Sequence, residues 1–463
     1  MTNNRVENLF SNIREKWHKL TPSSPKDEQS VTQRKTLKKY GVFLNEENNF
    51  VSPAVSRFSE SYYKNFKLEH IAHPNTFPFF ITLNSTELDL IDSNSNILNE
   101  KNLEKTNKVI HTEGSDKYKI LIDYYSETDS NIIFNKLSDL DKRILLFIAT
   151  FRNVQFLQIV KETGAQTARV ERSLERLHRY FLIDKWKFYR DPIIEGEEKS
   201  NLMGDCYSIY SHGTTLLLVH NLISKEYTYK WKEVLKEEDS FTPIRCWKTV
   251  DAYLSFRLKD DFVSYAPFSY MEAFEYLEEV KVPLTRNTTN QNKKYTEQSQ
   301  RIIQELKPNS EKSQNFKLIK KRKRVPRQRF NGQFVLRNNT GRSVKIDIYP
   351  FITKSEINSD MSKLGNVFKH YGHHLKNGVD ENGDTRLLLI IVDNPSQIEA
   401  IEDHYHVSDS YNSLNSILFL DLTAVSEKDI LSSLKVLVLN KDKQHKLKTA
   451  KFSFSKILQG ELA

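Results

Sequence analysis

The chain has 463 residues, including 27 Phe and 21 Tyr, which is enough apolar material for two to four domains of about 100–200 residues each. It holds only two cysteines, Cys206 and Cys246, so a disulfide framework and a cysteine metal site are excluded and a reducing cytosol is favoured. The longest apolar runs, 144–149 and 387–392, are far shorter than the ~18–20 residues that cross a bilayer. We therefore expect no signal peptide, no transmembrane segment and a cytoplasmic location.

The formal charge of +9 is concentrated in one segment. Between Arg301 and Lys345 there are 14 Lys or Arg and two Glu, so this stretch carries +12 and the remainder of the chain about −3. Such a local excess indicates contact with a polyanion, although a charge run is as often a solvated linker. We interpret residues 286–329 as a basic flexible linker.

Two less regular regions open the chain. Residues 1–40 are predicted to form a basic tail with a short amphipathic helix, because Leu9, Ile13 and Trp17 follow helical spacing. Residues 41–130 hold short apolar runs between Asn, Ser and Asp clusters, which predicts a small α+β module with long loops. Neither pattern points to a particular chemistry.

Residues 131–285 are predicted to form a DNA-binding domain. Three helical patterns are followed by two alternating segments and an apolar helix, and this order predicts a winged helix with a helical extension over 225–285. Ser138 or Asp139 is expected to cap the first helix, Asn153 to cap the second, and Gly164 to end it. The segments are Leu140–Ile148, Phe156–Val160, Gln166–Tyr180, Leu182–Phe188, Cys206–Tyr210 and Thr214–Leu222.

The third helical segment has two opposed faces. Projected at 100° per residue, four arginines cluster within about 80°, and four apolar residues cluster within about 60° on a face about 150° away. A helix that buries one stripe and offers guanidinium groups on the other suits the DNA major groove. The arginines are Arg169, Arg172, Arg176 and Arg179, and the apolar residues are Val170, Leu174, Leu177 and Phe181.

Individual contacts follow from this projection. Gln166, Thr167 and Arg169 are expected to reach base edges, because such helices enter the groove by their N-terminal end. Arg172 and Arg176 are expected to touch bases or phosphates, and Arg179 a phosphate. Salt bridges to Glu171 and Glu175 are the alternative use of these arginines. Backbone contacts elsewhere are expected from Lys185 and Lys187 of the hairpin and from Lys320, Lys321, Arg322, Lys323 and Arg324 of the linker.

Residues 330–463 return to regular alternation. The order strand, strand, helix, strand, helix, strand predicts a compact α/β domain around a mixed sheet, and a further helix and a final strand follow. A helix over 361–375 carries His370, His373 and His374 on one turn, which we interpret as an exposed or core-edge cluster, not a metal site. The strands are expected at Gln333–Arg337, Ser343–Tyr349, Leu387–Val392, Ser416–Leu422 and Val436–Leu439, and the later helices at Pro395–Tyr405 and Glu427–Leu434.

Two short motifs flank the predicted hairpin: Leu-Ile-Asp-Lys at 182–185 and Tyr-Ser-His-Gly-Thr-Thr-Leu-Leu at 210–217. With the helix-turn-helix before them, they resemble the replication-relaxation family of plasmid and mobile-element proteins. The likeness extends loosely over 330–395. Phe-Asn-Gly-Gln at 330–333 lies where that family often has a Pro-Asp-Gly turn, and Lys-Ile-Asp at 345–347 lies where it often has an acidic-x-acidic strand. The resemblance implies a role in plasmid replication, or in relaxing and processing DNA for conjugation.

The C-terminal layout also resembles nuclease folds of the PD-(D/E)xK type, in which carboxylates hold a divalent metal and a Lys lies near the attacking water. Here Asn331 replaces the first acid, Asp347 stands as the second, and Tyr349 occupies the position of the Lys. One carboxylate is a poor ligand set for Mg²⁺, so we interpret this domain as a degenerate nuclease scaffold. A nuclease centred on Asp347 with Mg²⁺ as cofactor is the enzymatic alternative.

These patterns predict an α+β multidomain protein in which a winged helix-turn-helix domain precedes a nuclease-like α/β domain. We expect a DNA-binding accessory or regulatory protein of a bacterial plasmid or integrative element. Its expected partners are double-stranded DNA and a relaxase or replication initiator, with no metal or cofactor of its own. No relaxase-type Tyr with a two-His motif is visible, so nicking is not expected. A transcription regulator and a protein-docking adaptor are the remaining alternatives.

Overall fold

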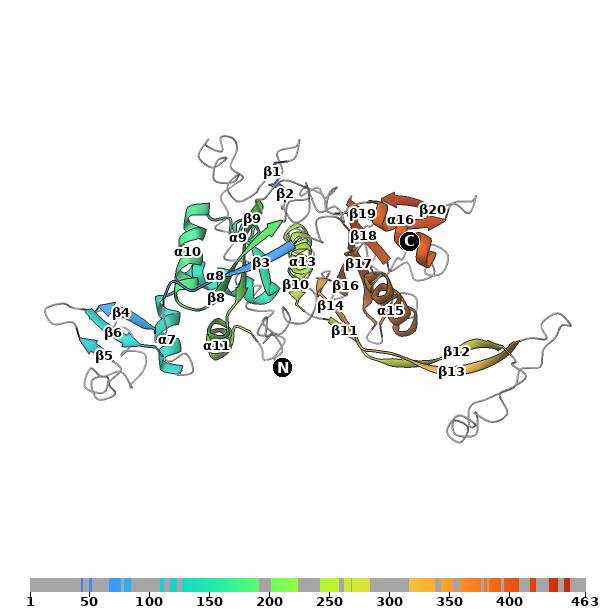
Figure 1. Cartoon of the computed structure of the whole chain (residues 1–463), viewed down its shortest axis with the longest axis horizontal. Coiled ribbons are helices and arrows are strands. Elements are labelled where there is room, and N and C mark those ends of the chain that lie inside the picture. Colours follow the sequence, from blue (N-terminus) through green and yellow to red (C-terminus); the bar gives the residue numbers. More distant parts are fainter. Residues whose placement is uncertain are drawn as a thin grey trace, which may run out of the picture.

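The structure is a computed structural model, and it shows a mixed α/β protein, as expected (Figure 1). None of its described helices is long and apolar enough to cross a membrane. The residues described are 43–44, 50–51, 66–75, 79–84, 109–111, 117–122, 127–190, 201–223, 242–257, 262–267, 269–283, 316–337, 343–352, 359–375, 379–380, 383–392, 395–407, 417–421, 433–439 and 445–449.

A helical core is followed by a strand hairpin. The three predicted helices are α8 (Asp139–Phe151), α9 (Phe156–Thr163) and α10 (Thr167–Arg179). The hairpin consists of β8 (Ile183–Arg190) and β9 (Asn201–Ile209), and α11 (Ser211–Val219) follows it. A short strand between α8 and α9, β7 (Asn153–Gln155), pairs antiparallel with β9. Both hairpin strands extend beyond the predicted segments, and residues 191–200 between them lie outside the described residues.

Local signals explain where these helices begin and end. Ser138 caps α8 in a capping box, accepting a hydrogen bond from the Asp141 amide while the Asp141 carboxylate accepts one from the Ser138 amide. Gly164 ends α9 in the left-handed conformation, at φ 63°, as predicted. Asn153 is not the cap of α9, because it lies in β7 and pairs with β9. Gln155 takes the N-cap position of α9 instead.

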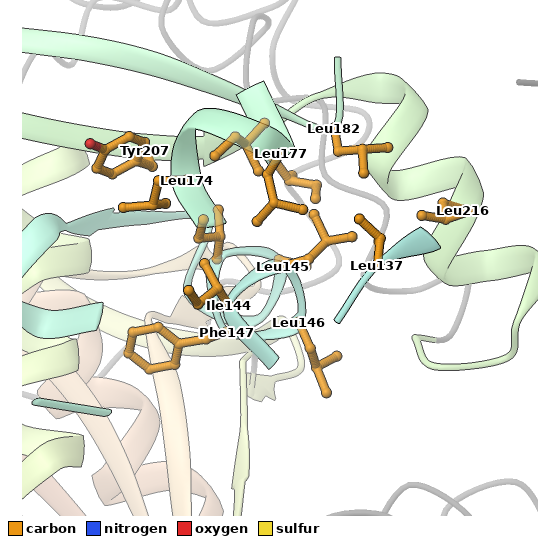
Figure 2. Close-up of a cluster of buried hydrophobic side chains, with 14 of the residues drawn as sticks. Leu137, Ile144, Leu145, Leu146, Phe147, Leu174, Leu177, Leu182, Tyr207 and Leu216 are labelled. Atoms are coloured by element: carbon orange, nitrogen blue, oxygen red, sulfur yellow. The ribbon is translucent and has the colours of Figure 1, made fainter. Parts of the chain in front are cut away.

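The helices and the hairpin share one apolar core, shown in part in Figure 2. Ile144 and Ile148 of α8 are fully buried, as are Val170 and Leu177 of α10. Tyr207 of β9 packs into the same cluster, so the sheet closes over the helices. Burying such side chains contributes about 1.5–3 kcal/mol each, which fixes α10 against α8 along its apolar stripe.

The region predicted as a separate N-terminal module shares this core. Strand β3 (Phe66–Ile71) pairs with β8, so the sheet order is β3-β8-β9-β7. A second sheet, β4 (Phe80–Asn84), β6 (Lys117–Leu121) and β5 (Val109–His111), and the helix α7 (Glu127–Lys136) add residues to the same cluster. The first described strands, β1 (Phe43–Leu44) and β2 (Phe50–Val51), pair antiparallel with each other. The predicted helix within 1–40 lies outside the described residues.

The C-terminal part is built on a seven-stranded mixed sheet of order β10-β15-β16-β17-β18-β19-β20. Parallel pairing joins β16 to β17 and β17 to β18, and the other neighbours are antiparallel. The predicted hairpin and later strands are all present, whereas β10 and β20 were not predicted, and the helix expected at 427–434 falls mostly outside the described residues. The strands are β10 (Phe262–Ala266), β15 (Gly332–Arg337), β16 (Ser343–Pro350), β17 (Thr385–Val392), β18 (Ile417–Asp421), β19 (Leu434–Leu439) and β20 (His445–Thr449).

Helices cover both faces of this sheet. On one face lies α13 (Thr242–Phe256), whose Ala252 and Phe256 join the core formed with β15 to β18. On the other face lie α15 (Ser359–His374) and α16 (Pro395–Tyr405). The opposite side of α13 contributes Val250 and Leu254 to the helical core. Helix α13 therefore packs against both halves, whereas the sequence predicts an extension of the first half alone.

The basic segment is not a linker throughout. Strand β13 (Phe316–Val325) pairs over ten positions with β12 (Phe274–Pro283), and this two-stranded ribbon extends away from both cores (Figure 1). At its base, β11 (Ser269–Met271) pairs with β14 (Gln328–Phe330). The flexible-linker interpretation is thus wrong for 316–329, because the glutamate-bearing strand β12 pairs with the basic strand β13. Residues 284–315 are not described.

Candidate nucleic-acid interface

Helix α10 presents the predicted row of arginines to solvent. Arg169, Arg172 and Arg179 are exposed, and Gln166 at the N-cap is exposed as well. Thr167, in the first turn, is half-buried. Because Val170, Leu174 and Leu177 are buried on the opposite side, the helix cannot rotate without exposing them. The two-faced projection from the sequence therefore agrees with the fold.

Arg176 is engaged differently from its three neighbours. Its Nη1 lies 2.6 Å from Oδ2 of Asp141, which is fully buried in the first turn of α8. The same carboxylate oxygen accepts hydrogen bonds from the amide and the hydroxyl of Ser138. Arg176 therefore holds α10 against the start of α8, and its assignment as a direct DNA contact is not favoured by this geometry.

A shallow pocket of about 400 Å³ lies between these two helices. Three guanidinium groups border it, and it opens at the N-terminal turn of α8, where backbone amides favour anions. Asp139 lies at the rim and Asp141 is paired with Arg176, so the three arginines and two aspartates leave a net charge of only +1. The pocket is lined by Ser138, Asp139, Leu140, Arg169, Arg172, Ser173 and Arg176.

The predicted lysines of the hairpin have acidic neighbours. Lys185 forms an ion pair with Asp205 of β9 at 2.9 Å. Lys187 lies opposite Glu69 of β3 in the antiparallel register. Both side chains are half-buried. This part of the hairpin consequently adds less positive charge than its sequence suggests.

The ribbon carries the densest positive charge among the described residues. Strand β13 has six Lys or Arg, and β12 has three Glu and one Lys, so the paired strands carry a net +4. Ion pairs join Lys320 to Glu279 at 3.6 Å and Arg322 to Glu275 at 3.6 Å. Exposed pairs of this kind contribute about 0–1 kcal/mol, so a phosphate can displace the glutamates at little cost.

The remaining basic side chains of the ribbon differ in their partners. Lys323 forms an ion pair with Glu278, and this pairing raises the pKa of Lys323. Lys321 and Arg324 are exposed, and no ion pair joins either one to a described residue. They are the two residues of the predicted basic run that are most available to a phosphate.

Asp347, the candidate second acid of a nuclease, is fully buried in β16 and surrounded by donors. Its Oδ1 accepts hydrogen bonds from Ser269 at 2.5 Å and Gln333 at 2.8 Å. Its Oδ2 accepts one from Tyr371 at 2.7 Å and forms an ion pair with Arg386 at 2.5 Å.

These donors compete with a metal for the carboxylate. Burial lowers the pKa of Arg386, but the Asp347 carboxylate together with Tyr371 and Asp380 raises it on balance, so the guanidinium stays charged beside the acid. Four donors, of which Arg386 is positively charged, leave this carboxylate poorly suited to Mg²⁺. We do not propose a nuclease centred on Asp347.

The three histidines of α15 face the base of the ribbon. The ring of His373 stacks on Phe274 with centroids 3.8 Å apart. Nε2 of His370 lies 2.7 Å from the carbonyl oxygen of Pro326, and Nε2 of His374 lies 3.0 Å from that of Glu272. The cluster thus packs α15 against the ribbon, in keeping with its interpretation as a core-edge cluster.

Comparison with protein-family models, with curated proteins and with solved structures gives no match. The arrangement of these side chains is therefore the basis for a functional assignment.

Proposed function

We propose that this chain is a double-stranded DNA-binding protein in which α8 to α10 and the β8–β9 hairpin act as a winged helix. The observation that carries the proposal is the face of α10, where Arg169, Arg172 and Arg179 are exposed while the opposite stripe is buried. In proteins of this class the third helix lies in the major groove and reads base edges from its N-terminal end. Gln166, Thr167 and Arg169 are then the base-reading residues.

The ribbon supplies the second part of the proposed interface. A two-stranded β-ribbon is narrow enough to enter or follow a groove of the duplex. Its exposed Lys321 and Arg324, and the lysines whose glutamate partners a phosphate can displace, would contact the backbone without regard to sequence. In this proposal α10 selects the site and the ribbon adds affinity for any duplex.

The biological setting is proposed from the sequence resemblance. A DNA reader with a second α/β domain suits an accessory or regulatory protein of plasmid replication, DNA relaxation or transfer. The C-terminal domain would then act as a nuclease-like scaffold, retained for binding, and a relaxase or a replication initiator would be its protein partner. Pull-down with and without nuclease treatment distinguishes a protein contact from one bridged by DNA.

The test is a DNA-binding titration at several salt concentrations, on a site first selected from random duplexes. If four to six phosphates are neutralised, log K falls against log[salt] with a slope of about −4 to −5. Arg169→Ala and Arg172→Ala are expected to reduce the preference for the selected site, by about 1–3 kcal/mol for a base contact. Glu175→Ala, at an exposed position of the same helix, is the matched control.

Two outcomes would overturn the proposal. One is a salt-independent affinity, since a protein that binds the phosphate backbone must release counterions. The other is unchanged site preference in both arginine variants, which would leave α10 as a protein-docking helix.

A further inference from the structure

Two histidines and one aspartate meet beside the end of α10. His70 lies in β3, His73 lies two residues beyond this strand, and Asp184 lies at the start of β8. Nε2 or Nδ1 of each histidine and a carboxylate oxygen of Asp184 all lie within 4.8 Å of one another. In the described part of the chain, this is the one such group of three metal-ligating side chains.

The hydrogen bonding of His73 leaves two acceptors facing each other. Nδ1 of His73 lies 2.8 Å from the carbonyl oxygen of His178, and a carbonyl can only accept, so Nδ1 carries the proton. In a neutral imidazole Nε2 then bears a lone pair. That nitrogen lies 3.3 Å from Oδ1 of the buried Asp184, which also only accepts. Two acceptors at this spacing need either a metal ion between them or a second proton on the imidazole.

The spacing fits a tetrahedral metal ion. Ligands held at about 2.0–2.1 Å from Zn²⁺ lie about 3.3 Å apart at tetrahedral angles, and His73 and Asp184 already have this separation, at 3.3 Å. Nε2 of His70 is closer to the carboxylate, at 2.8 Å, so it must move by about half an ångström. Its side chain is 38% exposed, which allows that movement and gives an ion access from solvent.

We propose that His70, His73 and Asp184 bind a divalent transition metal of the zinc class, with a fourth position open to water. Two imidazoles and one carboxylate favour Zn²⁺ over Mg²⁺ or Ca²⁺, which prefer oxygen ligands alone. The bond from His73 Nδ1 to a backbone carbonyl is the outer-shell support that metal-bound histidines commonly have.

The metal fastens the segment after β3 to the end of α10. Asn75 donates a hydrogen bond to the carbonyl of Arg179 at 3.0 Å, and the ring of His73 stacks on Phe181 with centroids 4.6 Å apart. Phe181 has a φ of 56° and forms the turn that ends α10. A metal ligated by His73 therefore restrains both the segment and this turn, and it is expected to raise the melting temperature.

The test is titration of the full chain with Zn²⁺, and with Co²⁺, after removal of metal by a chelator. One Zn²⁺ per chain is expected by calorimetry, and Co²⁺ is expected to give the intense visible absorption of tetrahedral coordination. His70→Gln and Asp184→Asn are each expected to weaken Zn²⁺ binding at least about 10–100-fold, because even the loss of a residue that only hydrogen-bonds to a ligand typically costs this much. His404→Ala, which removes an exposed histidine of α16, is the control and should bind as the parent does.

Loss of affinity in the two ligand variants, with the control unchanged, supports the site. Two results would overturn it: the absence of saturable binding, or equal affinity in ligand and control variants. In either case His73 is instead an imidazolium ion that pairs with Asp184. If Asp184→Asn fails to fold by circular dichroism, His70→Gln decides the matter, because its position is partly exposed and its replacement leaves the buried aspartate paired with His73.

Discussion

The guanidinium of Arg176 lies 2.6 Å from the carboxylate of Asp141, and this contact joins the last turn of α10 to the first turn of α8. Asp141 is fully buried, whereas the Arg176 side chain is 40% exposed. The aspartate thus depends on Arg176 and Ser138 for partners, while the arginine retains access to solvent. Arg176 therefore holds α10 against α8, and so it positions the other arginines of this helix.

Arg176→Ala is expected to destabilise the protein, because it leaves a buried carboxylate with one partner fewer. The free energy of unfolding should fall by about 1–3 kcal/mol, measured by urea denaturation. Arg172→Ala, one turn earlier on the same exposed face, should change it by no more than about 0.5 kcal/mol. Equal stability in the two variants would contradict a structural role for Arg176.

The sequence predicts the faces of α10 well, because a helical projection depends only on local spacing. It does not predict the partner of Arg176, since Asp141 lies 35 positions away and only the packing of two helices brings them together. The same limit applies to His70, His73 and Asp184. The spacing of the two histidines was a visible signal, but the aspartate lies in a strand more than 100 positions later.

The ribbon was missed for a related reason. Six basic residues in ten suggested a solvated linker, since β13 lacks the apolar alternation of a half-buried strand. The stabilising partner is β12, whose glutamates lie opposite or diagonal to these cations. Charge complementarity between two strands that are distant in sequence produces no alternation of apolar and polar residues in either strand, so neither strand is recognisable by itself.

Variants of the ribbon should change the salt dependence of DNA binding in opposite directions. Lys321→Gln with Arg324→Gln removes two cations that have no ion pair with a described residue, so the slope of log K against log[salt] should become shallower by about 2. Glu275→Gln with Glu279→Gln frees Arg322 and Lys320 for phosphates, so the slope should become steeper by up to about 2. Anisotropy titrations on a random duplex measure both, and two unchanged slopes would mean that the ribbon does not touch DNA.

Any side chain in place of Gly213, at the start of α11, is expected to lower the stability of the protein. A Cβ at this position would lie 2.1 Å from the backbone oxygen of Leu182, which cannot move away as a side chain could. Gly213→Ala should therefore lower the free energy of unfolding by about 1–3 kcal/mol. Gly372→Ala in α15 meets nothing within 4 Å and should raise it by about 0.5–1 kcal/mol through a higher helix propensity. Thermal melts of the pair check both signs, and a Gly213→Ala protein as stable as the parent would refute this packing.

The buried carboxylate of Asp347 gives the sharpest test between a structural and a catalytic C-terminal domain. Arg386→Leu removes its ion-pair partner and leaves a buried charge, which should cost about 3–5 kcal/mol of stability. Asp347→Asn with Arg386→Leu removes both charges, so its cost should be smaller than the sum of the two single changes. Urea denaturation of the three variants measures this coupling.

A nicking assay tests the catalytic alternative directly. Supercoiled plasmid incubated with Mg²⁺ or Mn²⁺ should be nicked no faster by the parent than by Asp347→Asn. Nicking that requires Asp347 would show that a metal displaces the four donors around it, and would make the domain a nuclease after all.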